Sequence, residues 1–191
     1  MKKWIYGAAA AAVVLAGCGM QAEKEETDNE VKVPIMSEGV TTAIESDLIN
    51  AEGEAIGKIL LTGDKKGTGI RISAEGLEPG VKAIHVHEKG ECTPPDFKSA
   101  GSHFNPEHKE HGFENPKGFH AGDLPNIEVD AEGKVDLETV SQYISLKEGH
   151  PGYLLDEDGS AVVVHEKADD YKTDPAGNSG DRIACAAFNK K

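Results

Sequence analysis

Short runs in which apolar and polar residues alternate dominate the chain from about residue 54 onward. Alternation with a period of two is typical of β-strands, whose successive side chains point to opposite faces. Turn signals rich in glycine and proline separate the runs, and none shows a clean helical period. The predicted strands are 55–62, 68–74, 83–87, 127–129, 134–140, 161–165 and 182–188, with a short further candidate at 143–146. We expect 127–129 and 134–140 to pair as a hairpin around Glu132-Gly133.

This succession of short strands predicts an all-β sandwich or barrel with Greek-key connections. Two long segments, 88–124 and 166–181, do not fit the regular spacing. Long irregular loops in a compact domain are usually functional or disordered. Because these two contain most of the remaining reactive side chains, we interpret them as functional loops.

The N-terminus has the composition of an export signal. Met1-Lys2-Lys3 is basic, and the apolar run 5–15 is too short to span a bilayer comfortably. Residues 15–18, Leu-Ala-Gly-Cys, resemble a bacterial lipobox, so we interpret 1–17 as a lipoprotein signal peptide and Cys18 as the lipidated residue. An ordinary secretory signal with a chance cysteine is the alternative.

The segment that follows the signal is acidic and poor in aromatic residues. We therefore predict a disordered tether over 18–46 and a folded domain over 47–191. The expected location is the outer face of the bacterial cytoplasmic membrane, reached through a lipid anchor only.

The other two cysteines and the net charge narrow the possibilities further. Outside the cytoplasm a disulfide between Cys92 and Cys185 would be stable, and it would stabilise the fold by about 4–5 kcal/mol on the chain-entropy model. A pair of buried free thiols is the alternative. The formal net charge of −14 argues against a nucleic-acid partner, because phosphate binding requires a basic face.

Histidines supply the strongest chemical signal. His85 and His87 would point to one face of a strand, about 6.6 Å apart along the backbone, where two imidazoles can share a metal. Two solvated histidines are the alternative. The remaining histidines are His103, His108, His111, His120, His150 and His165. Four of them fall in the first long loop with Asp123 just after, a composition that suits zinc or copper; any single loop histidine could instead be solvated.

Several motifs together resemble the bacterial copper–zinc superoxide dismutases. They are HVHEKGEC (85–92), SAGSHFNP (99–106), HG (111–112), HAGDLPN (120–126), VVHEKADD (163–170) and GNSGDRIAC (177–185). The resemblance runs from about Ala55 to the C-terminus. It implies a Greek-key, eight-stranded flattened β-barrel with two long functional loops. The sequence departs from the family at Ala83, Ile84 and Ala186, where glycine, an aromatic residue and glycine are usual, and these positions concern packing.

The resemblance also implies two adjacent metals, one copper (Cu²⁺/Cu⁺) and one zinc (Zn²⁺) per subunit. The copper ligands would be His85, His87, His103 and His165, and the zinc ligands would be His103, His111, His120 and Asp123. His103 would bridge the metals and take part in catalysis, Asp169 would link ligands of both metals, and Cys92 and Cys185 would form the family's disulfide. His108 and His150 match no ligand position and are interpreted as surface residues.

The implied reaction is the dismutation of superoxide to O₂ and H₂O₂ at the cell surface. Arg182 is the predicted substrate-binding residue, since guanidinium is always charged and its donors suit a small anion; a surface salt bridge to Asp181 or Glu166 is the alternative. Lys167 and Lys172 are weaker candidates for guiding the anion. A non-catalytic copper- or zinc-binding lipoprotein is the alternative function, and an adhesion domain would not need this ligand set. The sequence leaves open whether the protein is a monomer or a homodimer.

Overall fold

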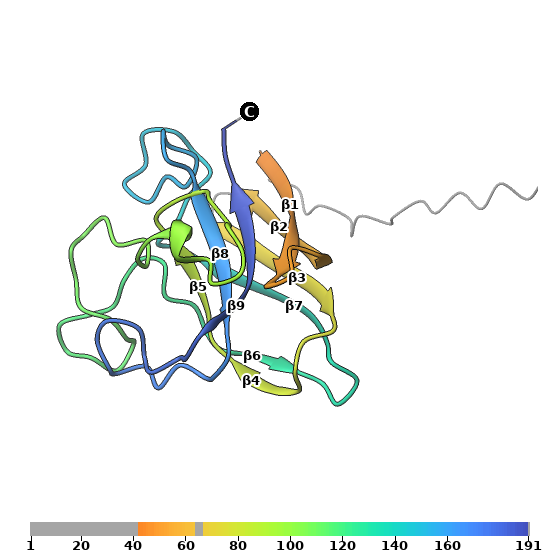
Figure 1. Cartoon of the computed structure of the whole chain (residues 1–191). Coiled ribbons are helices and arrows are strands. Elements are labelled where there is room, and N and C mark those ends of the chain that lie inside the picture. Colours follow the sequence, from red (N-terminus) through yellow and green to blue (C-terminus); the bar gives the residue numbers. More distant parts are fainter. Residues whose placement is uncertain (1–41, 64–66, 191) are drawn as a thin grey trace, which may run out of the picture. The chain divides into compact units, whose positions relative to one another are not determined.

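The computed structural model describes residues 42–63 and 67–190. Within them lie nine strands and one short 3-10 helix, η1 (Lys98–Ala100), in the first long loop (Figure 1). The strands are β1 (Thr42–Asn50), β2 (Ala55–Gly63), β3 (Thr68–Glu75), β4 (Gly80–Lys82), β5 (Ile84–His87), β6 (Ile127–Val129), β7 (Lys134–Ser141), β8 (Ser160–His165) and β9 (Arg182–Phe188). In this part of the chain, no helix is long and apolar enough to cross a membrane.

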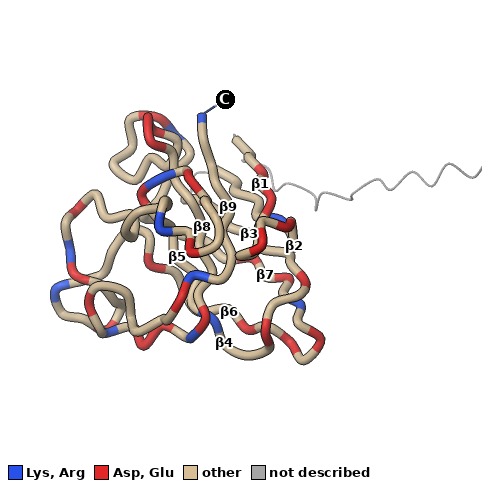
Figure 2. The backbone as a smooth tube through the Cα atoms, viewed as in Figure 1, with Lys and Arg blue, Asp and Glu red and all other residues tan. Residues whose placement is uncertain are grey.

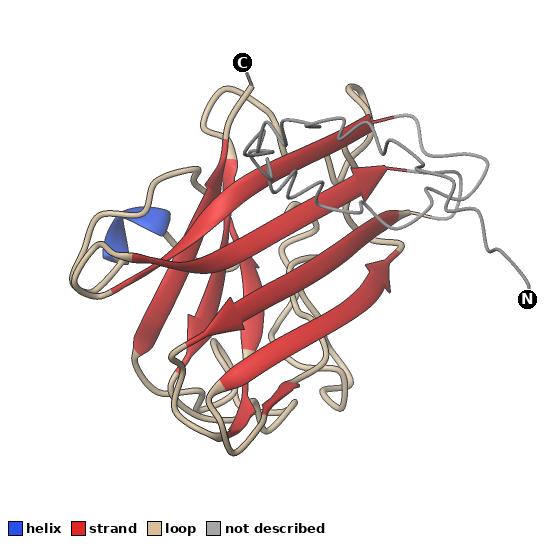
Figure 3. Ribbon diagram, turned by 90° about the vertical axis from the view of Figure 1, so that its right-hand side faces the viewer, coloured by secondary structure: helices blue, strands red, loops and turns tan. Residues whose placement is uncertain are grey.

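The strands form a curled antiparallel barrel with a non-sequential order. Seven strands hydrogen-bond in the order β5-β8-β9-β1-β2-β3-β7, and β4 pairs with β6 (Figure 3). β4 and β5 form one chain segment interrupted at Ala83, whose N–H donates to Lys167 and whose carbonyl accepts from His165. If β4 and β5 are counted as one strand, the barrel has eight strands. Contacts between β6 and β7 close it. The predicted all-β Greek-key fold is confirmed.

Apolar side chains on the inward face of the strands form the core. Ile59 and Leu61 on β2 lie opposite Ile72 and Ile70 on β3, and all four are buried inside the barrel. A second, smaller cluster lies outside this core, beneath the first loop. It consists of Phe97, Ala100, Ala161, Val163 and Cys185. This cluster attaches the loop to β8 and β9, the strands next to the candidate site.

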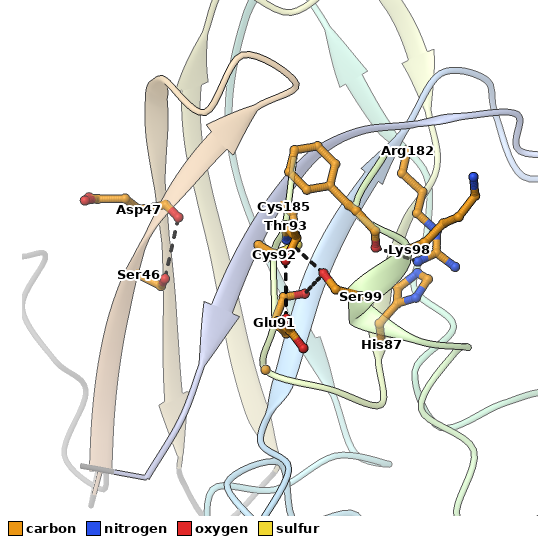
Figure 4. The surroundings of a disulfide bond; sticks show 12 residues. Ser46, Asp47, His87, Glu91, Cys92, Thr93, Lys98, Ser99, Arg182 and Cys185 are labelled. Carbon is orange, nitrogen blue, oxygen red and sulfur yellow. Dashed lines mark hydrogen bonds between the residues drawn. A yellow bond between two sulfur atoms is a disulfide. The ribbon is translucent and has the colours of Figure 1, made fainter. Parts of the chain in front are cut away.

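The disulfide strengthens that attachment. Cys92 of the first loop is bonded to Cys185 of β9, 93 positions further along the chain, with a Cα–Cα distance of 5.7 Å (Figure 4). Ser99 braces the same loop, because its hydroxyl donates to the Glu91 carbonyl and accepts the Thr93 N–H. The predicted disulfide is therefore confirmed, and the alternative of two free thiols is wrong.

Three predictions about the strands need correction. β1 begins at Thr42, inside the segment predicted as tether, so the folded domain includes residues 42–46. Apolar side chains in β1 are unevenly spaced, with an irregular register at Leu48/Ile49, which hides the strand period. The signal peptide, Cys18 and the tether up to residue 41 lie outside the described residues.

The predicted hairpin of 127–129 with 134–140 is wrong, although the turn between them exists. Gly133 donates to Asp130 in that turn, yet β6 pairs with β4 while β7 pairs with β3. The chain thus crosses between sheets at this turn, which a local alternation pattern does not reveal. Residues 143–146 form no strand and contribute only an isolated bridge, Ser145 to Tyr153, and β4 lies outside the predicted strands.

Candidate metal centre

Strand pairing brings the histidines together at one side of the barrel. β5 pairs with β8, so that His85 and His87 lie beside the strand that ends at His165. The first loop then returns to β5 through two isolated bridges, His87 to His103 and His85 to Asp123. All of these side chains are buried, which rules out the alternative of solvated histidines on a strand face.

Four histidine nitrogens in this cluster are buried and have no hydrogen-bond partner. They are Nδ1 of His85 and Nε2 of His87, His103 and His165. The same four residues can each offer one ligand atom within 4.8 Å of the others. Buried polar atoms in proteins are nearly always paired, and an unpaired one costs about 1–3 kcal/mol. Four convergent unpaired nitrogens therefore fit a metal such as copper, for which imidazole is a suitable ligand.

The other ring nitrogens of these histidines are held by the surrounding chain. Nε2 of His85 lies 2.9 Å from Asp169 Oδ2, and Nδ1 of His87 donates to the Gly101 carbonyl at 3.0 Å. Nδ1 of His165 lies 3.2 Å from the Ser179 hydroxyl. Such partners fix the orientation of an imidazole ligand and determine which nitrogen faces the metal.

A second cluster surrounds Asp123. Its Oδ1 atom lies 3.0 Å from Nδ1 of His103, 3.0 Å from Nδ1 of His111 and 3.2 Å from Nδ1 of His120. Nδ1 of His103 and Nδ1 of His120 are 3.4 Å apart. Four ligands about 2 Å from a tetrahedral metal are about 3.3 Å from one another, so these separations fit zinc. Oδ2 of Asp123 accepts the backbone N–H groups of Gly112 and His120, which leaves Oδ1 directed at the three imidazoles.

His103 and Asp169 connect the two clusters. Nδ1 of His103 belongs to the cluster around Asp123, while its Nε2 is one of the four unpaired nitrogens. The two carboxylate oxygens of Asp169 lie 2.9 Å from His85 Nε2 and 3.0 Å from His111 Nε2. Gly177 packs so closely here that an added Cβ would lie 1.9 Å from Asp169 Oδ1. The arrangement is that expected for a bridging imidazole and a linking carboxylate; their roles stay predictions.

Burial keeps the imidazoles of the first cluster neutral. It lowers the pKa of His103 to about 4 and that of His165 to about 2, and it also lowers the pKa of His87 well below its usual range. The neighbouring histidines and Arg182 also lower the pKa of His87. A neutral imidazole has a free lone pair for a metal, so this environment favours ligation over protonation.

A pocket of about 370 Å³ opens onto this cluster. Its walls include His87, His103 and His165 together with Arg182 and residues 173–176 of the second loop. Arg182, labelled in Figure 4, is partly buried. Its Nη1 and Nη2 donate at 2.7 Å to the carbonyls of Phe97 and Gly101. In the described part of the chain it forms no ion pair with Asp181 or Glu166, so that alternative is wrong.

The lysine candidates lie less favourably than Arg182. Lys167 and Lys172 do not line the pocket, and they are ion-paired with Glu166 and Glu114 at 3.7 and 2.7 Å. Lys98 of η1 lies beside Arg182 in Figure 4 and is paired with Asp96 at 2.7 Å. The sequence did not indicate that Lys98 lies near Arg182, since only the fold of the first loop brings the two residues together.

The remaining histidines lie where the sequence placed them. His108 and His150 are both exposed. His150 accepts the Gly152 N–H through its Nδ1, which is a local loop contact. Within the described residues, two groups of possible metal ligands share His85 and His103, and they are completed by His87 and His165 in one and by His111 and Asp123 in the other. His120 joins the second cluster through its contacts with Asp123 and His103.

Comparison with known proteins places this geometry in a family. Residues 55–188 match the family described as copper/zinc superoxide dismutase (SODC). The superoxide dismutase-like protein YojM of Bacillus subtilis is 50% identical over 181 residues, which cover 93% of this chain and 91% of that protein. Superoxide dismutase (Cu-Zn) 2 of Aquifex aeolicus is 51% identical over 144 residues, covering 75% and 84%.

Solved structures agree with the sequence relatives. The crystal structure of a double mutant of a SOD-like protein from Bacillus subtilis superposes with a TM-score of 0.75 at 55% identity. The match covers 76% of this chain and 97% of that one. The chain therefore belongs to the copper/zinc superoxide dismutase family, and this membership indicates an oxidoreductase that acts on superoxide with copper and zinc.

Proposed function

We propose that the protein dismutates superoxide at the cell surface, at a copper ion that shares His103 with a zinc ion. Copper would be held by the four unpaired nitrogens of His85, His87, His103 and His165. Zinc would be held by the cluster of His103, His111, His120 and Asp123. The observation that carries the proposal is the position of His103, with one nitrogen in each cluster.

The overall reaction converts two superoxide anions and two protons to O₂ and H₂O₂. Bound copper supplies the one-electron chemistry, alternating between Cu²⁺ and Cu⁺, while zinc keeps one oxidation state. Arg182 draws the anion toward the three histidines at the base of the pocket. Its two carbonyl contacts hold the guanidinium in place, so that it needs no reorganisation when the anion arrives.

His103 is suited to hold a proton for the product. Its Nδ1 stays with the Asp123 cluster, its Nε2 has no hydrogen-bond partner within the protein, and the residue lines the pocket. Nε2 has a single lone pair, so it would take up a proton from solvent only when it is released from copper, and it would then be able to donate that proton to a reduced oxygen species near Arg182. The protein thereby couples anion binding, at Arg182, to proton delivery at His103.

The proposed surface location rests on the N-terminal segment. The basic start, the apolar run and the lipobox-like residues before Cys18 support export with a lipid anchor on the outer face of the cytoplasmic membrane. The disulfide between Cys92 and Cys185 is compatible with that location, because disulfides persist outside the cytoplasm. Metabolic labelling with a radioactive fatty acid tests it: Cys18→Ser should abolish labelling, whereas a wild type without label would contradict anchoring.

A non-catalytic metal-binding lipoprotein is the second candidate, and one of the relatives is itself named only superoxide dismutase-like. The two candidates differ in turnover. We expect about one copper and one zinc per chain by elemental analysis, together with superoxide consumption that a chelator removes and added metals restore. Full metal content without consumption of superoxide would favour the second candidate.

A further inference from the structure

The second long loop supplies a preformed wall of the pocket. The carboxylate of Asp170 accepts hydrogen bonds from the backbone N–H groups of Lys172 and Thr173, from the Thr173 hydroxyl and from the Asn178 amide, at 2.6–3.0 Å. Thr173 and Asn178 both line the pocket. One carboxylate therefore ties both ends of the segment 173–178 together.

One residue of this wall reaches the zinc cluster. Asp174 lines the pocket, and its Oδ1 accepts the backbone N–H of His111 at 2.7 Å. His111 in turn lies 3.0 Å from Asp123 through its Nδ1. The bond therefore runs directly from a candidate zinc ligand to the pocket wall, between residues 63 positions apart in the chain.

The negative charge of Asp174 is unexpected in a pocket for an anion. A carboxylate in a pocket for an anionic substrate repels the substrate, so its presence there requires another reason. Hydrogen bonds in which the acceptor is ionised are roughly twice as strong as neutral ones. A carboxylate thus holds the His111 backbone more firmly than a neutral side chain would, at some cost in anion attraction.

Other contacts also join the same two loops. Asp169 lies 3.0 Å from Nε2 of His111 but does not line the pocket, and two further contacts reach no candidate ligand. The Glu114 N–H donates to the Tyr171 carbonyl at 2.9 Å, and Lys172 is ion-paired with the Glu114 side chain at 2.7 Å. None of the residues in these two links lines the pocket. Asp174 is the contact that combines a candidate zinc ligand and a pocket-lining position.

We propose that Asp174 is a positioning residue that couples the zinc cluster to the wall of the substrate pocket. When His111 is held as a ligand, its N–H is directed at Asp174 and fixes the wall beside Arg182. When His111 is released, the wall loses this anchor and the pocket loses its shape. The inference deepens the proposed function and rests on it for the identity of the substrate.

The test compares Asp174→Ala with Asp174→Asn in the full-length protein. Co²⁺, bound in place of zinc, serves as the probe, because its visible absorption reports the ligand geometry. We expect Asp174→Ala to raise the Co²⁺ dissociation constant about 10- to 100-fold, as is typical when a group that orients a ligand is lost. Asp174→Asn should show a smaller increase, since the amide oxygen can still accept the His111 N–H, though more weakly than a carboxylate does.

Superoxide kinetics provide the second measurement. Asp174→Ala should lower kcat/KM through the displaced wall, although it removes a repelling charge, whereas Asp174→Asn should lower it less, since it keeps a weaker hydrogen bond to His111. Asp96→Ala is the matched control, because it removes a negative charge close to Arg182 without contacting His111. The control should leave the Co²⁺ spectrum unchanged.

Two outcomes would overturn the coupling. One is an Asp174→Ala protein with the spectrum and Co²⁺ affinity of the wild type. The other is an equal loss in Asp174→Asn and Asp174→Ala, which would assign the effect to charge alone. If the copper- and zinc-loaded wild type fails to consume superoxide while the Co²⁺ results hold, the proposed function fails and the coupling stands.

Discussion

Replacing Arg182 separates its two contributions, attraction of the anion and attachment of the first loop. Arg182→Ala removes the positive charge from the pocket and the two donors that bind the carbonyls of Phe97 and Gly101. Arg182→Lys keeps a charge but not the planar pair of donors. Copper should remain bound in both variants, since Arg182 is not among the convergent histidine nitrogens.

The expected size of the charge effect follows from Coulomb's law. Two unit charges about 4 Å apart attract by about 1 kcal/mol in water and by more in a partly buried pocket. One kcal/mol corresponds to about a fivefold change in rate, so Arg182→Ala should lower kcat/KM about five- to tenfold. Arg182→Lys should recover most of that loss. Both variants should lower the free energy of unfolding by about 1–3 kcal/mol, because the loop carbonyls lose a charged donor.

Pulse radiolysis at several salt concentrations measures the rate effect directly. The wild-type rate should fall between about 0.1 M and 1 M salt, over which the screening length decreases from about 10 Å to 3 Å. In Arg182→Ala this fall should be largely absent. Unchanged kcat/KM and an unchanged salt dependence in Arg182→Ala, with copper still bound, would refute the assignment.

Three further substitutions test the site and its support. His103→Ala should abolish the copper–zinc coupling and most of the activity, and full activity with one metal per chain would exclude the bridge. Gly177→Ala should weaken metal binding about 10- to 100-fold, because the added Cβ would displace the carboxylate of Asp169. Gly149→Ala is the control and should leave metal binding unchanged, since Gly149 has a similar positive φ but open space around it. Cys92→Ser should lower the stability of the metal-free protein by about 4–5 kcal/mol in urea unfolding; a loss below 1 kcal/mol would contradict this role of the disulfide.

Strands whose inner face is regularly apolar could be predicted from the sequence. The alternation in 68–74 persists because Ile70, Ile72 and Ala74 pack in the barrel, whereas within 134–140 only Val135 is buried and Leu137 is 38% exposed. The start of β1 could not be predicted, since only Leu48 among its residues is fully enclosed. Nor could the partner of β6, because a tight turn between two strands normally indicates a hairpin.

The histidine cluster could be anticipated from the motifs, but its supporting contacts could not. Residue spacing says nothing about which nitrogen of His87 faces the pocket; that depends on the Gly101 carbonyl, which also binds Arg182. Likewise, the contact of Asp174 with His111 joins two loops that lack any periodic pattern. Such contacts depend on long-range folding and leave no local signal in the chain.

The acidic net charge and the anionic substrate act against each other at different distances. Acidic and basic residues alternate along the loops (Figure 2), and lysines near the pocket are paired, as Lys98 is with Asp96. Among the residues that line the pocket, permanent charge is confined to Arg182 and Asp174. At about 0.01 M salt the screening length is about 30 Å, so the anion is repelled by the whole chain with its charge of −14. At about 0.1 M and above, only the local charges act.

The wild-type rate should therefore pass through a maximum near 0.1 M salt. Salt screens the long-range repulsion by the whole chain at lower concentrations than it screens the short-range attraction by Arg182. A rate that falls steadily from 0.01 M upward would show that the local charges dominate at every distance.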